Sequence, residues 1–482
     1  MNPSTQSFRV TNTKASAFGL TLVTLVALSG CASSKGITHD QVMREPATLG
    51  ATAKFDAWPV EQWWINFQDP TLNQLINLAL KDNPSVVQAA KRLDKAKAYV
   101  GYAQSALSPQ VTGSAEVVHQ RLSVNAFYPP PYGGSYQSIA NASLNATWDL
   151  DFWGKNRSAL QAALSQTDAA KAEQSAAKLM VSTAVAQTYY QLAQQIAQQK
   201  LAVQTLEQRS HELKLVKTRI ETGLDTNVEL AQGQGNIYSA KVELEAASEA
   251  VNLTRNALAA LTVQAPQALD SVQASLPTMA TQAVPDDVPI DLMSRRPDLA
   301  AANAAVNSAS ADISSAKAEF YPNVSLSAFI GLSSFGLSKF LDLGSTVVGA
   351  GPAIHLPIFD AGRLRANLTS KHADLDIAVT RYNEVLLQAV HDVADQMTSI
   401  KAARHESGDQ GAALHAAESA YRLASIRYEA GLTNYLTVLS AEDSLLRERS
   451  KMINLQARTV ALNIALIKSL GGGFNSQQAA NH

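Results

Sequence analysis

Cysteine is almost absent from this sequence, because Cys31 is the only cysteine among 482 residues. A lone thiol has no partner within the chain, which excludes an internal disulfide. Two interpretations of Cys31 remain at this point. It could be a small apolar side chain that fills a gap in the core, or it could be the site at which a lipid is attached. A lipid on the sulfur would also prevent the thiol from acting as a nucleophile.

Acidic residues are absent before Cys31, whereas Arg9 and Lys14 provide positive charge there. An apolar run follows at 15–28, and its 14 residues are too few for a membrane-spanning helix, which needs about 20. A basic start followed by a short apolar run and small residues predicts a secretory signal peptide at 1–30.

The letters LSGC at 28–31 resemble a bacterial lipobox, with Leu28 at the third position before the cut and Cys31 as the modified residue. We therefore expect a covalent N-acyl and S-diacylglycerol lipid on Cys31, and no other cofactor. Ala32 follows the cysteine, where an Asp would signal retention in the inner membrane. The sequence thus favours lipid attachment at the outer membrane.

Long apolar runs are also missing, because no stretch of 18 apolar residues follows residue 31. A membrane role would therefore have to come from the lipid or from β-strands. Charged residues make up only 17% of the chain and the net charge is −2, so electrostatics give no reason to expect nucleic acid as a partner. Aromatic residues do not alternate with basic runs, as they do in nucleic-acid-binding surfaces.

Catalytic motifs are missing as well. The pairs His211-Glu212 and His405-Glu406 lack the second histidine that a zinc-protease helix requires. No glycine-rich phosphate loop or dinucleotide-binding turn follows a predicted strand. We therefore predict that the protein is not an enzyme and holds no metal.

What the sequence does contain is an internal duplication. Residues 82–111 match residues 295–324, and RIETGL at 219–224 matches RYEAGL at 427–432. The matches occur in the same order at nearly one offset, which indicates a unit of about 210 residues used twice. Such a unit is too long for a solenoid repeat. The predicted segments are a signal peptide (1–30), a lipidated N-terminal segment (31–70), a first repeat (71–265), a linker (266–290), a second repeat (291–470) and a C-terminal tail (471–482).

Each repeat is expected to contain a helix, two strands, a long helix and a shorter helix. Alternating apolar and polar residues begin at Val111, Ala140, Val324 and Val348 and predict four strands with one apolar and one polar face. Residues 158–222 contain neither Gly nor Pro and predict a helix of about 98 Å. Its counterpart at 363–430 is interrupted only by Gly408 and Gly411, which could mark a hinge or a local bulge. The fold class is therefore α+β.

Four strands are too few to close a barrel, because the smallest membrane barrels have 8 strands. If these strands span a membrane, several chains must share one barrel, since lipid cannot satisfy an open strand edge. Three chains would supply 12 strands and four chains would supply 16. The alternative is a half-buried sheet in a soluble domain, with the long helices serving as coiled-coil spacers.

Several stretches resemble the outer membrane factor family, and in particular its NodT-type efflux lipoproteins, which are relatives of TolC. The stretches are residues 63–84, 295–331, 356–366 and 427–446, and the resemblance extends over about 58–470. It implies a homotrimer in which a long α-helical barrel continues a 12-stranded β-barrel. It also implies a passive exit duct for small molecules such as drugs, with a periplasmic adaptor and an inner-membrane transporter as partners.

The same resemblance implies two groups of site residues. The helix turns are expected to contact the adaptor, although they could also be plain turns, and their residues are Gly223, Gly431, Arg219 and Arg427. The family often has an Asp that closes the tunnel at the position where this chain has Ser440. The sequence therefore does not decide which residues would close the tunnel here. The constriction candidates are Ser440, Asp443 and Tyr428.

Two other functions remain as alternatives. A type I protein-secretion duct would share the fold, but the family's protein exporters usually lack a lipobox. A periplasmic coiled-coil structural lipoprotein would need no pore, but it would not need four alternating strands either. The preferred hypothesis is an efflux duct, lipid-anchored in the outer membrane and extending into the periplasm.

Overall fold

The computed structural model describes residues 33–277 and 283–476. The predicted signal peptide and Cys31 lie outside the described residues. The chain divides into two compact units, each assembled from three separate segments. The strand unit comprises Met1–Val42, Lys95–Thr167 and Ala304–Thr380, and the helical unit comprises Met43–Asp94, Asp168–Asn303 and Arg381–His482.

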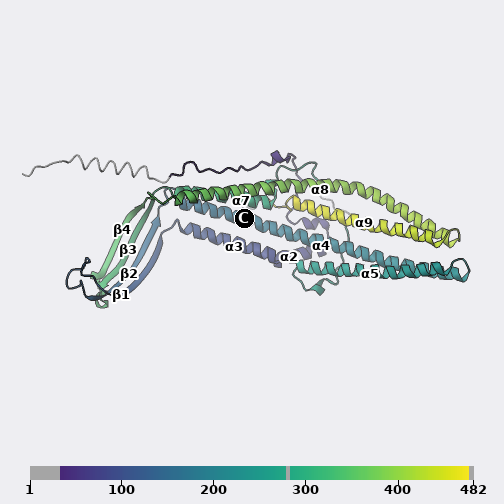
Figure 1. Ribbon diagram of the computed structural model, residues 1–482, viewed down its shortest axis with the longest axis horizontal. Coiled ribbons are helices and arrows are strands. Elements are labelled where there is room, and N and C mark those ends of the chain that lie inside the picture. The colour runs from purple at the N-terminus through teal and green to yellow at the C-terminus, as the bar shows by residue number, and fades with distance from the viewer. Residues whose placement is uncertain (1–32, 278–282, 477–482) are drawn as a thin grey trace, which may run out of the picture. The chain divides into compact units, whose positions relative to one another are not determined.

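The helices confirm the predicted duplication, because corresponding helices of the two repeats have equal lengths (Figure 1). Helices α3 (Pro84–Ser105) and α7 (Pro297–Ala318) each have 22 residues. Helices α4 (Lys155–Glu221) and α8 (Arg363–Glu429) each have 67, and α5 (Asn227–Leu261) and α9 (Tyr435–Ser469) each have 35. The other α-helices of the described residues are α2 (Pro70–Asp82) and α6 (Leu292–Arg295).

The two longest helices begin at carboxylate caps. Asp151 accepts hydrogen bonds from the amides of Asn156 and Arg157 at 3.0 and 2.9 Å, at the start of α4. Asp360 does the same for the amides of Gly362 and Leu364 at 3.0 and 2.8 Å, at the start of α8. These side chains satisfy amides that have no partner within the helix.

Helix α8 runs unbroken through Gly408 and Gly411. The structure therefore has no bulge at these glycines. A Cβ atom added at either glycine would meet no atom within 4 Å.

The four predicted strands form one antiparallel sheet in the order β1-β2-β3-β4. Their bounds are Gln110–Arg121 (β1), Tyr136–Asp149 (β2), Asn323–Phe335 (β3) and Thr346–His355 (β4). Strand β4 ends three residues before the expected Ile358, because Pro357 has no amide proton for a ladder hydrogen bond.

The strand register brings the predicted apolar positions of all four strands onto one face, whereas Phe329 and Val347 lie on the opposite face. Leu144 pairs with Gly113 on one side and Ile330 on the other, and Ile330 pairs with Val348. Because side chains alternate along a strand, the same face carries a larger apolar set. Its members are Val111, Ala115, Val117, Ala142, Ala146, Trp148, Val324, Leu326, Ala328, Leu332, Ala350 and Ile354.

The opposite face carries hydroxyl and amide side chains along β1, β2 and β3. Ser114 and Ser143 lie within hydrogen-bonding distance at 3.1 Å, and Ser333 donates to Asn141 at 2.8 Å across the strands. Among all strand residues only Ala140 is buried. Among the described residues, no helix therefore covers either face of the sheet, and strands β1 and β4 each present an unpaired edge.

The core of the helical unit lies where α2, α4, α5 and α9 meet. Asp69 caps α2 by accepting from the amides of Thr71 and Leu72 at 2.9 and 3.1 Å, and it also accepts from the hydroxyl of Tyr189 on α4 at 2.7 Å. Apolar side chains fill the space around this contact. The largest are Trp63, Trp64, Leu72, Ile76, Tyr190, Leu192, Leu258 and Ile464.

Arg296 closes the end of α9 against the start of α7. Its guanidinium donates to the carbonyl of Ser469 at 3.1 Å and contacts Asp298 at 2.7 Å and Asp392 at 3.2 Å. Helix α9 ends at Ser469, as the glycines at 471–473 predict. These glycines pack against neighbouring chain segments. A Cβ atom on Gly471 would overlap the carbonyl oxygen of Arg295.

Among the described residues, no helix combines the length and the apolar character that crossing a bilayer requires.

Candidate functional site

The candidate site consists of the two helix turns that the sequence identified, one between α4 and α5 and one between α8 and α9. Gly223 and Gly431 have φ angles of +76° and +74°, which only glycine adopts without strain. The amide of Leu224 donates to Arg219 O and that of Leu432 to Arg427 O, each at 2.8 Å. Both turns therefore end their helices in the same Schellman geometry.

The helices that leave these turns are capped as well. The hydroxyl of Thr226 accepts from the amide of Val228 at 3.2 Å, and Glu229 accepts from the amide of Thr226 at 2.8 Å. The side chain of Asn434 accepts from the amide of Thr437 at 3.1 Å. The two turns are thus fixed by local hydrogen bonds, which leaves their outer side chains available for a partner.

Apolar side chains project from both turns at equivalent positions. Leu224 is 63% exposed and Leu432 is 68% exposed, and Val228 and Leu436 are exposed one helical turn further on. We call these four residues the tip patch. Exposed apolar side chains at equivalent positions of two turns are candidates for contact with a protein partner.

Arg219 lies beneath the tip patch and is buried, being only 7% exposed. Its Nε contacts Asp225 at 3.1 Å, its Nη1 donates to the carbonyl of Tyr428 at 2.9 Å, and its guanidinium stacks 4.3 Å from the ring centre of Tyr428. The hydroxyl of Tyr428 donates to Asp225. This cluster joins the first turn to the second, so Arg219 positions the turns and its guanidinium is not part of their outer surface.

Tyr428 is 2% exposed, which places its ring between the two turns. Burial and the hydrogen bond to Asp225 raise the pKa of the Tyr428 hydroxyl above its usual range. The hydroxyl therefore keeps its proton and remains a donor at any physiological pH. Arg427, the repeat counterpart of Arg219, is exposed and forms no salt bridge among the described residues.

The other constriction candidates lie on α9. Ser440 and Asp443 are both exposed, three residues apart on the helix. The carboxylate of Asp443 lies 3.7 Å from Arg209 on α4. Their role in closing a tunnel stays a prediction.

A buried group that the sequence does not reveal lies next to Asp443. Glu442 is 0% exposed, and its Oε1 accepts from Gln208 at 3.1 Å and from Arg209 at 3.4 Å. Nearby, the hydroxyl of Tyr421 donates to Glu212 at 2.6 Å. A Glu-Asp pair in a long polar helix gives no sequence signal for burial, because such pairs are usually solvated.

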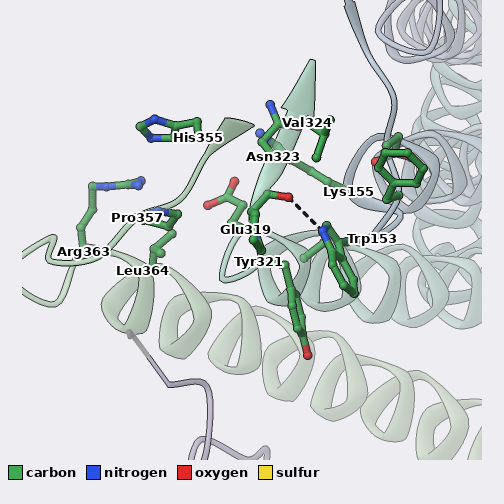
Figure 2. A pocket seen from close by; sticks show the side chains of 14 residues that line it. Trp153, Lys155, Glu319, Tyr321, Asn323, Val324, His355, Pro357, Arg363 and Leu364 are labelled. Atoms are coloured by element: carbon green, nitrogen blue, oxygen red, sulfur yellow. Dashed lines mark hydrogen bonds between the residues drawn. The ribbon is translucent and has the colours of Figure 1, made fainter. Parts of the chain in front are cut away.

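A small pocket lies in the strand unit, where β2, β3 and β4 join their helices (Figure 2). It encloses about 230 Å³. Figure 2 shows Trp153 and Tyr321 on one side of the pocket and Arg363 on the other, with Glu319 between them. The two aromatic rings stack at 4.6 Å, and the indole of Trp153 donates to Pro322 O at 2.9 Å. These contacts hold the turn after β2 against the segment that precedes β3.

The start of the described chain lies along α8 within the strand unit. Asp376 accepts from the amides of Asp40 and Gln41 at 3.1 and 2.8 Å, and the ring of His39 stacks on that of His372 at 6.0 Å. Arg365 donates to the carbonyl of Ser33. We call residues 33–42 the N-terminal strap. Among the described residues, no three His, Cys, Asp or Glu side chains come together as metal ligands.

Comparison with known proteins gives consistent matches. A model of the family "Outer membrane efflux protein" matches residues 75–263 and 288–472, which correspond to the two copies of the repeat. Multidrug resistance outer membrane protein MdtP of Escherichia coli K12 is 31% identical over 462 residues, which cover 93% of this chain and 94% of the relative. MdtQ of Escherichia coli O157:H7 is 29% identical, with 93% and 96% covered.

Solved structures are similar as well. The outer membrane protein VceC of Vibrio cholerae is 38% identical with a TM-score of 0.81, and the match covers 87% of this chain and all of VceC. The CmeC outer membrane channel of Campylobacter jejuni has a TM-score of 0.83 over 92% of this chain and 97% of CmeC. At 23% identity, the CmeC match supports the fold alone.

Proposed function

Since the chain belongs to the outer membrane efflux protein family, we propose that it is the exit duct of a tripartite pump, through which small organic molecules leave the cell. Membership of the family makes the chain an efflux channel protein of the outer membrane. We further propose how many chains assemble, which proteins the channel binds, that a lipid is attached to it and which class of substrate it exports. The duct itself catalyses no reaction and opens or closes a path for solutes.

The observation that carries the proposal is the uncovered sheet. It has an apolar face and a polar face, and within the part of the chain that the structure describes its two edges are unpaired and no helix packs on it. An open edge is not tolerated in lipid, so the edges of β1 and β4 have to pair with other copies of the chain. A homotrimer supplies 12 strands, above the minimum of 8 for a closed barrel. The apolar face then contacts lipid and the polar face lines the bore.

The length of the helices supports a conduit that continues from such a barrel. Helices α4 and α8 have 67 residues each, which corresponds to about 100 Å. Three copies of the chain supply six of these long helices and six shorter helices equivalent to α5 and α9. Helices of this length suit a tube through the periplasm.

The tip patch is the surface that we propose for the periplasmic adaptor, which in turn binds the inner-membrane transporter. Its leucines and valine remain exposed in the single chain, and the turns beneath them are fixed by caps and by the Arg219 cluster. A preformed apolar surface of this kind loses little conformational entropy when a partner binds. Gly223 and Gly431 give both turns the shape that exposes these side chains.

The lipid on Cys31 is proposed from the lipobox and from the place of the N-terminal strap. Ser33, two residues after Cys31, lies against Arg365 near the start of α8. Helix α8 begins eight residues after the end of β4. Ser33 therefore lies near the level at which the strands end, and an acyl chain attached two residues earlier in the sequence would enter the membrane there.

The substrates are proposed to be varied small molecules. MdtP and MdtQ are named as multidrug resistance proteins. Serine, threonine and asparagine side chains on the polar face favour passage through water over selective binding. Selection of the substrate would then rest with the transporter.

Mass measurement and planar bilayer recording of the detergent-purified protein test the duct. We expect the mass of three chains and stepwise single-channel conductance. The matched control is the same preparation dissociated to monomers, which should conduct no current. A monomeric protein that never conducts, even with the Arg219 cluster broken by substitution, would refute the proposal.

A further inference from the structure

A cluster of buried charged groups lies below the helix turns in the helical unit. Glu212 and Arg209 come from α4, Glu442 comes from α9, and Tyr421 comes from α8. Each glutamate lies about 11 residues from the glycine of its own hairpin, which is roughly 16 Å along the helix. The cluster therefore joins the two hairpins at one level below their tips.

Each of the two carboxylates has one bonded oxygen and one oxygen without a partner. Oε1 of Glu212 accepts from Tyr421 at 2.6 Å, and Oε1 of Glu442 accepts from Gln208 and Arg209. Oε2 of both glutamates is buried and, within the described part of the chain, has no hydrogen-bond partner. A buried ionised oxygen without a partner is strongly unfavourable.

The positive charge in the cluster is too small to balance both carboxylates. Arg209 is the guanidinium that contacts Glu442, at 3.4 Å. It also lies 3.7 Å from Asp443 and donates to the carbonyl of Asn236 on α5 at 3.3 Å. One cation is thus shared among several acceptors, and Glu442 is the buried carboxylate among them, because Asp443 is exposed. If both glutamates were ionised, Glu212 would add a second buried charge.

The lack of space around the two Oε2 atoms restricts which species could neutralise their charge. Both oxygens expose less than 1 Å² of surface, so water and metal ions do not reach them. The described residues also offer no group of three metal ligands at this place. A proton needs no additional volume. We propose that Glu212 and Glu442 together hold one proton at neutral pH, and that its release weakens the contact between α4 and α9 below the tips.

The electrostatics of the site agree with this geometry. Burial, followed by the charge of Glu212, raises the pKa of Glu442 to about 7, and Arg209 opposes that rise. Burial also raises the pKa of Glu212, against the hydrogen bond from Tyr421. Because the two groups interact, the proton belongs to the pair and not to one residue.

Other charged and titratable groups surround the pair on each packed helix. His211 on α4 lowers the pKa of Glu212, and Asp443 on α9 raises that of Glu442. Tyr421 on α8 and Tyr435 on α9 keep their hydroxyl protons, because burial raises the pKa of each, that of Tyr435 to about 12. From α5 the contact is the neutral carbonyl of Asn236.

The direction of the pH effect follows from linkage. The docked pair binds its proton more tightly than a free glutamate with the ordinary pKa of 4.5. The contact is therefore strongest below pH 4.5 and is progressively weakened as the pH rises to about 7. Above that pH the shared proton is released and the contact stays at its weakest.

Infrared titration of the full-length protein in detergent tests the proton directly. We expect the carbonyl band of a protonated carboxyl group to disappear with a midpoint near pH 7 in the wild type. The band should be absent in Glu442→Gln, and Glu212→Gln provides a second variant if the first does not fold. Glu243→Gln, an exposed position on α5, is the matched control and should retain the band.

Hydrogen exchange tests the mechanical consequence. Between pH 5 and pH 8, the protection of α9 amides near Glu442, corrected for the intrinsic exchange rate, should fall by at least about tenfold in the wild type and in Glu243→Gln. It should stay constant in Glu442→Gln. The proposal is overturned if no carboxyl group titrates between pH 5.5 and pH 8 in the wild type, or if the titrating band survives in both glutamine variants. Constant protection in a wild type that does titrate would overturn the proposed weakening.

Discussion

Substituting alanine for glycine is expected to have opposite effects at two places in the helical unit. Gly471 follows α9 with a φ angle of +88°, and its Cβ atom would overlap Arg295 O and lie 2.8 Å from the carbonyl carbon of the same residue. Gly411 lies within α8, and its Cβ atom would meet no atom within 4 Å. Gly471→Ala should therefore destabilise the protein, whereas Gly411→Ala should stabilise it.

The size of each effect follows from separate costs. An alanine in the left-handed region costs about 1–2 kcal/mol, and moving backbone to relieve an overlap in a packed site costs about 1–3 kcal/mol. Gly471→Ala should thus lose about 2–5 kcal/mol of unfolding free energy. Gly411→Ala should gain up to about 1 kcal/mol, because alanine loses less backbone entropy than glycine on forming a helix.

Circular dichroism during heating in detergent measures both variants. A large chain shifts by roughly 2 °C per kcal/mol, so we expect Tm to fall by about 4–10 °C for Gly471→Ala and to rise slightly for Gly411→Ala. All scans should use one heating rate, because unfolding of a large membrane protein is usually irreversible. If Gly471→Ala melts within 1 °C of the wild type, or if both variants lose the same stability, the close approach of Gly471 to Arg295 would be refuted.

Three further predictions concern the proposed lipid and the tips. Cys31→Ser should abolish incorporation of labelled palmitate, and continued labelling would exclude Cys31 as the attachment site. Tyr428→Phe removes the hydrogen bond to the carboxylate of Asp225, and a hydrogen bond to a charged group is worth about 1.5–3 kcal/mol. The contact between the turns should weaken, so trypsin should cleave faster after the buried Arg219. Unchanged cleavage, measured by mass spectrometry, would contradict the role of this hydroxyl in joining the turns. Leu432→Asp should abolish binding of the adaptor to immobilised protein. The same change at Leu253, an exposed position on α5, is the control and should leave binding intact. Equal loss of binding in both variants would exclude the tip patch as the adaptor-binding surface.

Much of the fold could be predicted from the sequence, because its elements are long and strongly periodic. Strand β2 alternates apolar and polar residues from Ala140 to Trp148, and the structure turns the apolar residues of this stretch to one face. Helix α4 was expected at 158–222 because Gly and Pro are absent there, and it spans Lys155–Glu221. The helix begins three residues earlier than expected because the carboxylate of Asp151 accepts hydrogen bonds from its first amides. This cap is hard to recognise in the sequence, because the turn between Asp151 and the helix contains Gly154 and shows no helical periodicity.

The contacts between hairpins could not be predicted in the same way. Periodicity indicates which face of a helix is buried, but it does not indicate which helix covers that face. Glu442 appears in the sequence as one charge in a polar helix, and its burial depends on Arg209 and Gln208, which lie more than 230 residues earlier. The burial of such a residue can be recognised only from a structure that contains both hairpins.

The duplication itself explains why identical residues of the two turns have different environments. Arg219 and Arg427 occupy the same position in the repeat, yet Arg219 is buried against Tyr428 and Arg427 is exposed. Two hairpins of one chain can meet along only one flank of each, so one arginine is enclosed and its counterpart is not. In a closed ring of three chains, the free flank of the second hairpin would face the first hairpin of the next chain. Among the residues that differ between the repeats, Asp225 pairs with Arg219, whereas its counterpart Thr433 carries no charge that could pair with Arg427.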